Sequence, residues 1–355
     1  MKFFGIPVRR KCCFYCWYIF VLFSFLYYSG LQEYLFAWSY SRHYIHWGPE
    51  ESLQTLISQM QIREASGVKP INEFSYPFTF IYQEKCRSKE PIRLMYIVKS
   101  AMHNFENREM IRNTWGYENK YIDVSIRTVF LLGYDFDSPD LQIKVEKEAN
   151  THKDIIQAEF IDSYYNNTLK AMMGLHWAFH YCENVKYFFF VDDDYYISTR
   201  NVLRFLRSPL NYPKYLEKFV ASAVNEYQDQ LYAGFVFNNV SPIRWYFSKW
   251  YVPLSEYPYS HWPTYVTAGA YVLSRKSLVN LYYASLFTKF FRFDDIFLGM
   301  AAKKAGIKPV HHNEFHFDKK PYSLEGYKWV IASHGFADPV QLLNAYNEQR
   351  SAGNA

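Results

Sequence analysis

The sequence predicts an α/β domain with a largely parallel sheet, preceded by one transmembrane helix. Two patterns carry this prediction. After residue 91, short continuous apolar runs alternate with helical patterns, which is typical of a parallel sheet with helices on both faces. Near the N-terminus, a long uncharged stretch follows three basic residues. Half of the 355 residues are hydrophobic, so the chain can bury a large core.

The first expected element is a membrane anchor at residues 12–32. A bilayer core requires about 20 mostly apolar helical residues, and the basic residues at 9–11 predict that residues 1–11 form a cytosolic tail. A cleaved signal peptide is the main alternative, but its apolar core is usually shorter. A buried soluble helix would have a polar face, which this stretch lacks. The sequence therefore favours an uncleaved signal anchor of a type II protein.

The rest of the chain divides into an expected stem and an expected lumenal domain. Residues 33–90 carry scattered charge, Gly and Pro without a clear strand pattern, and we expect them to form a stem with some helix around 50–62. The domain is expected at 91–355, with buried strands at 94–98, 128–133 and 187–191, a helix beginning at 108, and helices at 141–150 and 169–181. The net charge of +5 comes from scattered Lys and Arg residues, so no nucleic-acid partner is expected.

Three carboxylates follow the strand expected at 187–191, namely Asp192, Asp193 and Asp194. Ligands of open α/β sheets bind beyond the carboxyl ends of the strands. Adjacent carboxylates repel one another unless a cation compensates, and a hard divalent metal such as Mn²⁺ or Mg²⁺ prefers oxygen ligands. Such a metal would hold a diphosphate. The alternative is an acidic turn that caps a helix beginning near Ser198, which is common for Asp runs but weaker directly after five apolar residues.

Further motifs occur in order along residues 91–340. They lie at 97–116, at 162–170, at the acidic cluster, at 265–274 and at 293–299. Together they resemble the β-1,3-galactosyltransferase/N-acetylglucosaminyltransferase family, glycosyltransferase family 31. The resemblance implies a GT-A fold, in which a Rossmann-like nucleotide-sugar-binding sheet is fused to an acceptor-binding part. It also implies an inverting β-1,3-hexosyltransferase that moves galactose or N-acetylglucosamine from a UDP-sugar to a hydroxyl of a glycan on glycolipid or glycoprotein.

The resemblance also implies roles for single residues. It makes Asp295 the catalytic base, and it assigns the metal to Asp194 and His334, donor binding to Arg108, Arg112, Asp192 and Asp193, and acceptor binding to Asp294 and Gly269. Trp115 fits a packing role better than a binding one. Without the resemblance, Asp294 and Asp295 would be interpreted as a helix N-cap pair, and His334 as a surface loop residue.

The chain departs from the family pattern at three places. Asp294 stands where the family usually has Glu, the segment around Gly269 is less glycine-rich, and cysteines near 266 and 301 are absent. The first two departures motivate an alternative, a catalytically silent member that acts as a partner or chaperone of another transferase. A metal-dependent phosphotransferase or nuclease would also need clustered carboxylates, but it would not explain the anchor or the segment at 265–274.

The remaining signals concern the compartment. Cys86 and Cys182 are the only cysteines in the body of the chain, and they can form one disulfide in an oxidising compartment. Asn166 and Asn239 begin glycosylation sequons, which would be used only in a lumenal domain. Location in the Golgi membrane is therefore expected. The expected partners are the donor, the glycan acceptor and the bilayer, and homo- or hetero-oligomers with other transferases are compatible with the sequence.

Overall fold

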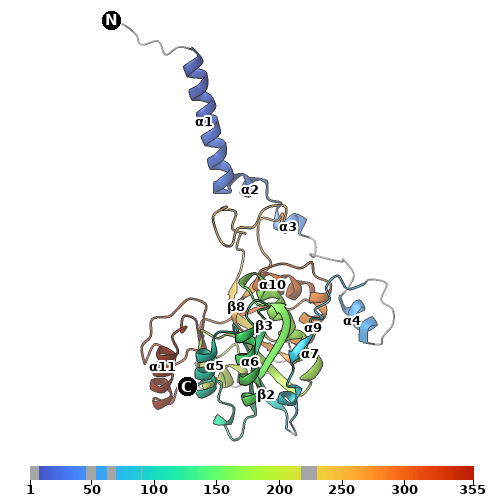
Figure 1. Ribbon diagram of the computed structural model, residues 1–355, viewed down its shortest axis with the longest axis vertical. Helices are drawn as coiled ribbons and strands as arrows, with labels where there is room; N and C mark the ends of the chain where they lie inside the picture. Colours follow the sequence, from blue (N-terminus) through green and yellow to red (C-terminus); the bar gives the residue numbers. More distant parts are fainter. Residues whose placement is uncertain (1–7, 45–52, 62–68, 89, 217–229) are drawn as a thin grey trace. The chain divides into compact units, whose positions relative to one another are not determined.

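The computed structural model describes residues 8–44, 53–61, 69–88, 90–216 and 230–355 (Figure 1). The chain divides into two compact units. One comprises residues 1–45 and 238–263, and the other comprises residues 46–237 and 264–355. The second unit contains the sheet and the motifs singled out in the sequence, whereas the first contains the expected anchor.

An eight-stranded sheet forms the centre of the second unit, in the order β1-β4-β3-β2-β5-β8-β7-β9. The middle strands β4, β3, β2 and β5 are parallel, while β1, β8 and β7 pair antiparallel with their inner neighbours. The expected parallel sheet is thus confirmed for the centre, and antiparallel strands widen it into a mixed sheet. The strand bounds are β1 Phe78–Phe80, β2 Ile92–Lys99, β3 Ile126–Tyr134, β4 Ile155–Ile161, β5 Val185–Asp192, β7 Tyr232–Phe237, β8 Tyr265–Ser274 and β9 Val310–His311.

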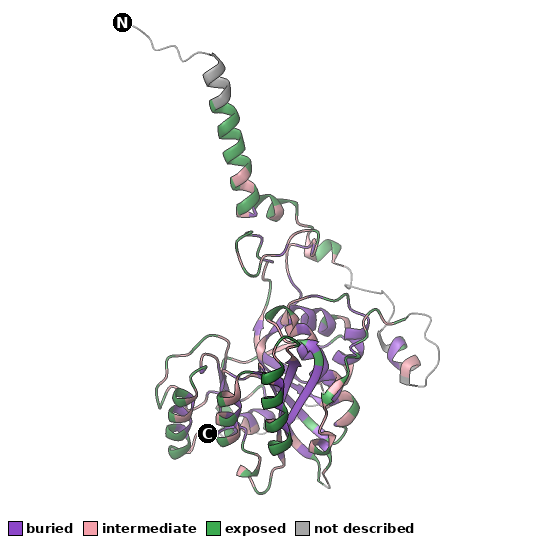
Figure 2. Cartoon of the chain, in the orientation of Figure 1, coloured by how far each residue is buried: buried purple, intermediate pink, exposed green. Residues whose placement is uncertain are grey.

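The inner strands are apolar along nearly their whole length because helices cover both faces of the sheet. Figure 2 shows these strands as buried, and residues 187–191 of β5 are almost completely inaccessible to solvent. The strands expected at 94–98, 128–133 and 187–191 are confirmed. Strand β4 was not expected, because Gln157 interrupts its apolar run. The Gln157 amide is buried and hydrogen-bonds with the Gln142 side chain and the Gly133 carbonyl.

Two sets of helices cover the faces of the sheet. Residues of α5 (Phe105–Asn113), α6 (Pro139–His152), α8 (Thr199–Arg207) and α11 (Pro339–Ser351) share one core cluster with the strands. The opposite face is covered by α7 (Asn167–Tyr181), α9 (Arg275–Leu286) and α10 (Asp294–Lys304), which contact one another. Gly174 of α7 lies against the side chains of Leu131 and Phe190. The helices expected at 141–150 and 169–181 are confirmed, and the helix expected from 108 begins at Phe105.

A small three-stranded sheet brings the C-terminal part of the chain next to the carboxylate cluster. It contains β6 (Tyr196–Ile197), β11 (Ala332–Ser333) and β10 (Phe315–His316). Strands β6 and β11 are antiparallel, with Ser333 opposite Tyr196. The residue after β11 therefore meets the residues before β6, which places His334 beside Asp194.

Part of the expected stem belongs to the sheet unit. Strand β1 pairs with β4, and the Asn72 amide donates to the carbonyl oxygens of Ser285 and Thr288. The boundary expected at residue 91 is therefore too late, since residues from about 70 onward already pack on the domain. Helix α4 (Leu53–Gln61) agrees with the helix expected around 50–62.

The first unit contains α1 (Val8–Ser29), α2 (Leu31–Phe36), α3 (Tyr40–His43) and the segment 238–263. In the described part of α1, large apolar side chains are exposed (Figure 2). Among the residues that the structure describes, no helix combines the length and the apolar character needed to cross a membrane.

Candidate active site

Lys99 joins three motifs that lie far apart in the sequence. It ends β2, directly beside Asp192 at the end of β5. Its buried Nζ lies 2.9 Å from Asp192 Oδ1 and 3.1 Å from Asp294 Oδ2, and it donates to the Ala268 carbonyl at 3.0 Å. Burial lowers the pKa of Lys99, but the charges of the two carboxylates outweigh it, so the pKa is raised overall. One buried cation therefore connects the carboxylate cluster, the segment beside Gly269 and the start of α10.

The position of this cation follows from the topology. Strand β3 lies on one side of β2 and β5 on the other, so the chain order reverses at β2. In open α/β sheets, ligands bind at the carboxyl ends of the strands at such a reversal. The sequence interpretation did not assign Lys99 a role. A lysine directly after the apolar run 94–98 was the available signal, because a buried charge there requires a partner.

Asp193 holds the loop that follows β2. Its buried Oδ2 accepts hydrogen bonds from Ser100 Oγ at 2.6 Å and Asn104 Nδ2 at 2.9 Å. The amide of Asn107 donates to the Asp193 carbonyl at 3.4 Å. Burial raises the pKa of Asp193, and its hydrogen bonds oppose that rise. The carboxylate cluster is thus built into the strand ends. Ser198 Oγ caps α8 by accepting from the Asn201 amide, so the cluster is not the cap of that helix.

Asp194 and His334 form a pair at the edge of the site. His334 Nε2 lies 3.0 Å from Asp194 Oδ2, and this contact raises the pKa of His334. The other oxygen, Asp194 Oδ1, is buried and has no hydrogen-bond partner among the described residues. A buried carboxylate oxygen without a donor fits a cation ligand.

The protein supplies only part of a metal shell at this point. Within the described ranges, no three His, Cys, Asp or Glu side chains are arranged to hold a metal ion. Two protein ligands are nonetheless consistent with Mg²⁺-type sites, where one or two carboxylates act together with substrate phosphates and water. The residues therefore fit a metal that is bound jointly with a diphosphate.

Asp294 and Asp295 occupy the first turn of α10, whose N-cap residue is Phe293. Asp294 is buried and directed to Lys99, so its side chain is held by the protein. Asp295 Oδ1 accepts from the Ile296 amide at 2.8 Å. Burial, followed by repulsion from Asp294, raises the pKa of Asp295 to about 7. A carboxylate with that pKa is matched to proton transfer near neutral pH.

Gly269 lies against the ring of Tyr195. A Cβ atom at Gly269 would fall 2.2 Å from Tyr195 Oη, so a larger side chain would displace this ring. The Tyr195 ring also lies 5.1 Å from the His334 ring, and its carbonyl accepts from Trp115 Nε1. The buried Trp115 therefore has the expected packing role. Tyr195 was missed because its only sequence signal is adjacency to Asp194.

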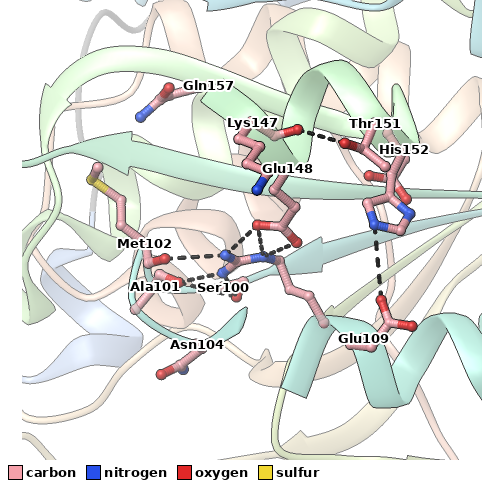
Figure 3. Close-up of polar contacts among 12 residues, drawn as sticks. Ser100, Ala101, Met102, Asn104, Glu109, Lys147, Glu148, Thr151, His152 and Gln157 are labelled. Atoms are coloured by element: carbon pink, nitrogen blue, oxygen red, sulfur yellow. Dashed lines mark hydrogen bonds and ion pairs between the residues drawn. The ribbon is translucent and has the colours of Figure 1, made fainter. Parts of the chain in front are cut away.

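Arg108 and Arg112, which the resemblance assigns to donor binding, both have protein partners in the structure. Arg108 is fully buried and donates to Glu148, Ser100 and the carbonyl oxygens of Ala101 and Met102. Figure 3 shows Glu148 beside the Ser100, Ala101 and Met102 positions.

Arg112 is also held by the protein. It pairs with Glu148 at 2.8 Å and with Asp154 at 2.8 Å. Arg108 thus supports the loop after β2, which carries the partners of Asp193, whereas Arg112 is held by Glu148 and Asp154.

The structure shows the expected disulfide, but it does not test whether the two glycosylation sequons are used. The structure pairs Cys86 with Cys182 in a disulfide. Asn239 is exposed. In the other sequon Thr168 is buried and donates to the Phe291 carbonyl. Use of either sequon stays a prediction.

Comparison with known proteins identifies the family of the chain. The galactosyltransferase family pattern matches residues 106–313. The β-1,3-galactosyltransferase brn of Drosophila melanogaster is 40% identical over 348 residues, which cover 98% of this chain and 99% of that protein. Human β-1,3-galactosyltransferase 1 is 33% identical over 283 residues, covering 80% of this chain and 81% of that protein. A human lactosylceramide 1,3-N-acetyl-β-D-glucosaminyltransferase is 34% identical over 275 residues, covering 76% and 69%. The chain belongs to the galactosyltransferase family.

Proposed function

We propose that this glycosyltransferase is an inverting β-1,3-hexosyltransferase that moves galactose or N-acetylglucosamine from a UDP-sugar to a glycan hydroxyl. The names of the relatives, two β-1,3-galactosyltransferases and a 1,3-N-acetylglucosaminyltransferase, support the linkage and the two donors. The observation that carries the proposal is the junction at Lys99, where the carboxylate cluster, the Gly269 segment and the Asp294–Asp295 pair meet. No comparison favours the silent-partner alternative.

Asp295 is the proposed base. Inverting transfer requires one group to take the proton from the acceptor hydroxyl as this hydroxyl attacks the anomeric carbon. The raised pKa of Asp295 suits that step. Lys99 neutralises Asp294 and Asp192, which limits the repulsion that Asp295 would otherwise meet when it ionises.

Asp194 and His334 are the residues that would hold a Mn²⁺ or Mg²⁺ ion. The buried, unpartnered Asp194 Oδ1 supports this assignment. When bound, such an ion would neutralise charge on the departing nucleoside diphosphate. Asp193 and the loop that it fixes, Ser100 to Asn104, would shape the donor side of the site.

The proposal includes a GT-A type fold and a place in the Golgi membrane. The mixed sheet, with its carboxylates at the strand ends, supports the GT-A assignment. The uncharged run at 12–32 and the exposed apolar side chains of α1 support a type II anchor with a lumenal catalytic unit. The disulfide between Cys86 and Cys182 is consistent with an oxidising lumen.

The test is a panel of radiolabelled UDP-sugars offered with Mn²⁺ to the purified full chain. UDP-galactose or UDP-N-acetylglucosamine should be transferred or hydrolysed, and Asp295→Asn should slow transfer by about 10²-fold or more. Asp140→Asn is the matched control, because Asp140 also lies in the first turn of a helix but is exposed. Folded protein that neither transfers nor hydrolyses any donor would overturn the proposal.

A further inference from the structure

The segment 238–263, which connects β7 to β8, exposes a group of large aromatic side chains. Trp245, Tyr246, Phe247 and Trp250 are 54%, 45%, 65% and 45% exposed. Soluble monomers rarely leave contiguous apolar surface of this kind in water, and such patches mark interaction sites. None of these side chains has a role in the proposed reaction.

This segment is fixed against the end of α1. The Tyr246 amide donates to the Tyr28 carbonyl at 3.2 Å, and the Phe247 and Tyr28 rings stack with centroids 5.3 Å apart. Gly30, with φ of 73°, ends α1 directly against the Arg244 backbone, where a Cβ atom would not fit. The exposed aromatics therefore keep a defined position relative to the helix.

Arg244 holds the segment in shape. Its guanidinium is buried and donates to the carbonyl oxygens of Val252, Tyr257 and Tyr259 at 2.6 to 3.0 Å. A buried arginine satisfied by three carbonyl groups makes a stable turn rather than a mobile loop. The aromatic side chains thus project from a structured base.

An open groove of about 510 Å³ lies between α1 and this segment. Its apolar lining comes from Phe20, Val21, Phe25 and Tyr28 of α1 and from Trp245 and Phe247. The groove is continuous with the exposed apolar surface of α1. The medium that surrounds the exposed surface of α1 therefore also fills the groove.

We propose that residues 245–250 form a membrane-docking surface that inserts into the lumenal interface of the bilayer crossed by α1. The occupant is lipid because the surface continues the proposed membrane helix, and because Trp and Tyr gather at the headgroup level. Lys249 Nζ lies 4.4 Å from the centre of the Trp250 ring, as suits a cation beside lipid phosphates. The segment 238–263 connects β7 to β8, so the docking surface is covalently linked to the catalytic unit at both ends.

This inference rests on the proposed anchor, and the experiment separates the two. The full chain is reconstituted in phosphatidylcholine vesicles that contain tritiated lipid, with p-benzoylphenylalanine in place of one residue at a time. Positions 245 and 247 probe the surface. Phe14, an exposed residue of α1, probes the anchor, and the exposed Phe136 of the sheet unit is the control.

Light-induced lipid adducts are expected at 245, 247 and 14, at least about fivefold above those at 136, because only the first three contact lipid. Adducts at 14 with background levels at 245 and 247 would overturn the docking surface and leave the anchor intact. Background levels at all positions would overturn both. Adducts to protein instead of lipid at 245 and 247 would also overturn it. Donor-panel activity of the same vesicles tests the transferase proposal separately.

Discussion

Replacing Arg108 by Met tests whether this residue supports the site from inside the protein. Arg108 is fully buried, its Nη2 lies 2.6 Å from Glu148, and it also donates to the carbonyl oxygens of Ala101 and Met102. The substitution would leave Glu148 with Arg112 as its remaining partner, and two carbonyl groups would lose their donor. Breaking a buried ion pair from one side costs about 3–5 kcal/mol.

The expected result is a loss of stability rather than a specific loss of donor affinity. A destabilisation of that size lowers the melting temperature by roughly 6–20 °C for a domain of this size class. The assay is thermal unfolding of the full chain in detergent, followed by measurement of KM for the UDP-sugar at a temperature where the variant is folded. Arg87→Met is the control, because Arg87 is exposed and should change stability by less than about 0.5 kcal/mol.

A double substitution sharpens this test. In Arg108→Met/Glu148→Met, both charges of the ion pair are removed, so neither is left buried without its partner. The double variant should therefore be more stable than Arg108→Met alone. The reasoning would be refuted if Arg108→Met kept the wild-type melting temperature and raised only the KM for the donor. That outcome would restore the direct donor contact that the family resemblance implied.

The further predictions concern three residues of the reaction and one cysteine of the disulfide. Asp295→Asn should lower kcat by about 10²-fold or more with an unchanged melting temperature, as for loss of a general base. Because the base must be ionised and the pKa of Asp295 is about 7, kcat/KM should rise with pH and level off above about pH 7. A kcat/KM that stays constant from about pH 5 to about pH 9 would contradict this role. His334→Ala should raise the Mn²⁺ concentration for half-maximal activity by roughly 10–100-fold, whereas an unchanged metal titration would exclude it as a ligand. Lys99→Met should abolish transfer because Asp192 would lose its buried counter-charge, and wild-type kcat in this variant would argue against the junction. Cys182→Ser should destabilise the fold by about 2–5 kcal/mol, which thermal unfolding under non-reducing conditions can measure.

The apolar runs of the chain predicted the centre of the fold correctly. Strands β2, β3 and β5 are buried on both faces, so their sequences are apolar without alternation and stand out. Strand β4 escaped prediction because the buried Gln157 breaks the pattern. Only the folded chain supplies the hydrogen bonds that make a glutamine acceptable at that position.

The site shows a similar division. Asp192 to Asp194 could be placed at a strand end from local sequence alone, because the strand before them is unmistakable. The proximity of this cluster to Asp294 could not be predicted, because about 100 residues separate them in the sequence. Lys99 joins them only after β2, β5 and α10 have packed. Burial is likewise a tertiary property. The full burial of Arg108 shows that this side chain supports the site from inside the protein, which the sequence motif did not reveal.

The expected anchor and the aromatic segment differ in how far local sequence reveals them. The anchor is a local property, since an uncharged apolar run after basic residues is visible in one stretch of sequence. The segment at 245–250 gave no signal of its own, because exposed aromatic residues cannot be told from core residues without knowing what covers them. The positions of the carboxylate cluster and of the apolar strands could therefore be predicted from neighbouring residues in the sequence. The contacts of Lys99, the Asp194–His334 pair and the aromatic surface join distant parts of the chain, so they form only when the chain folds.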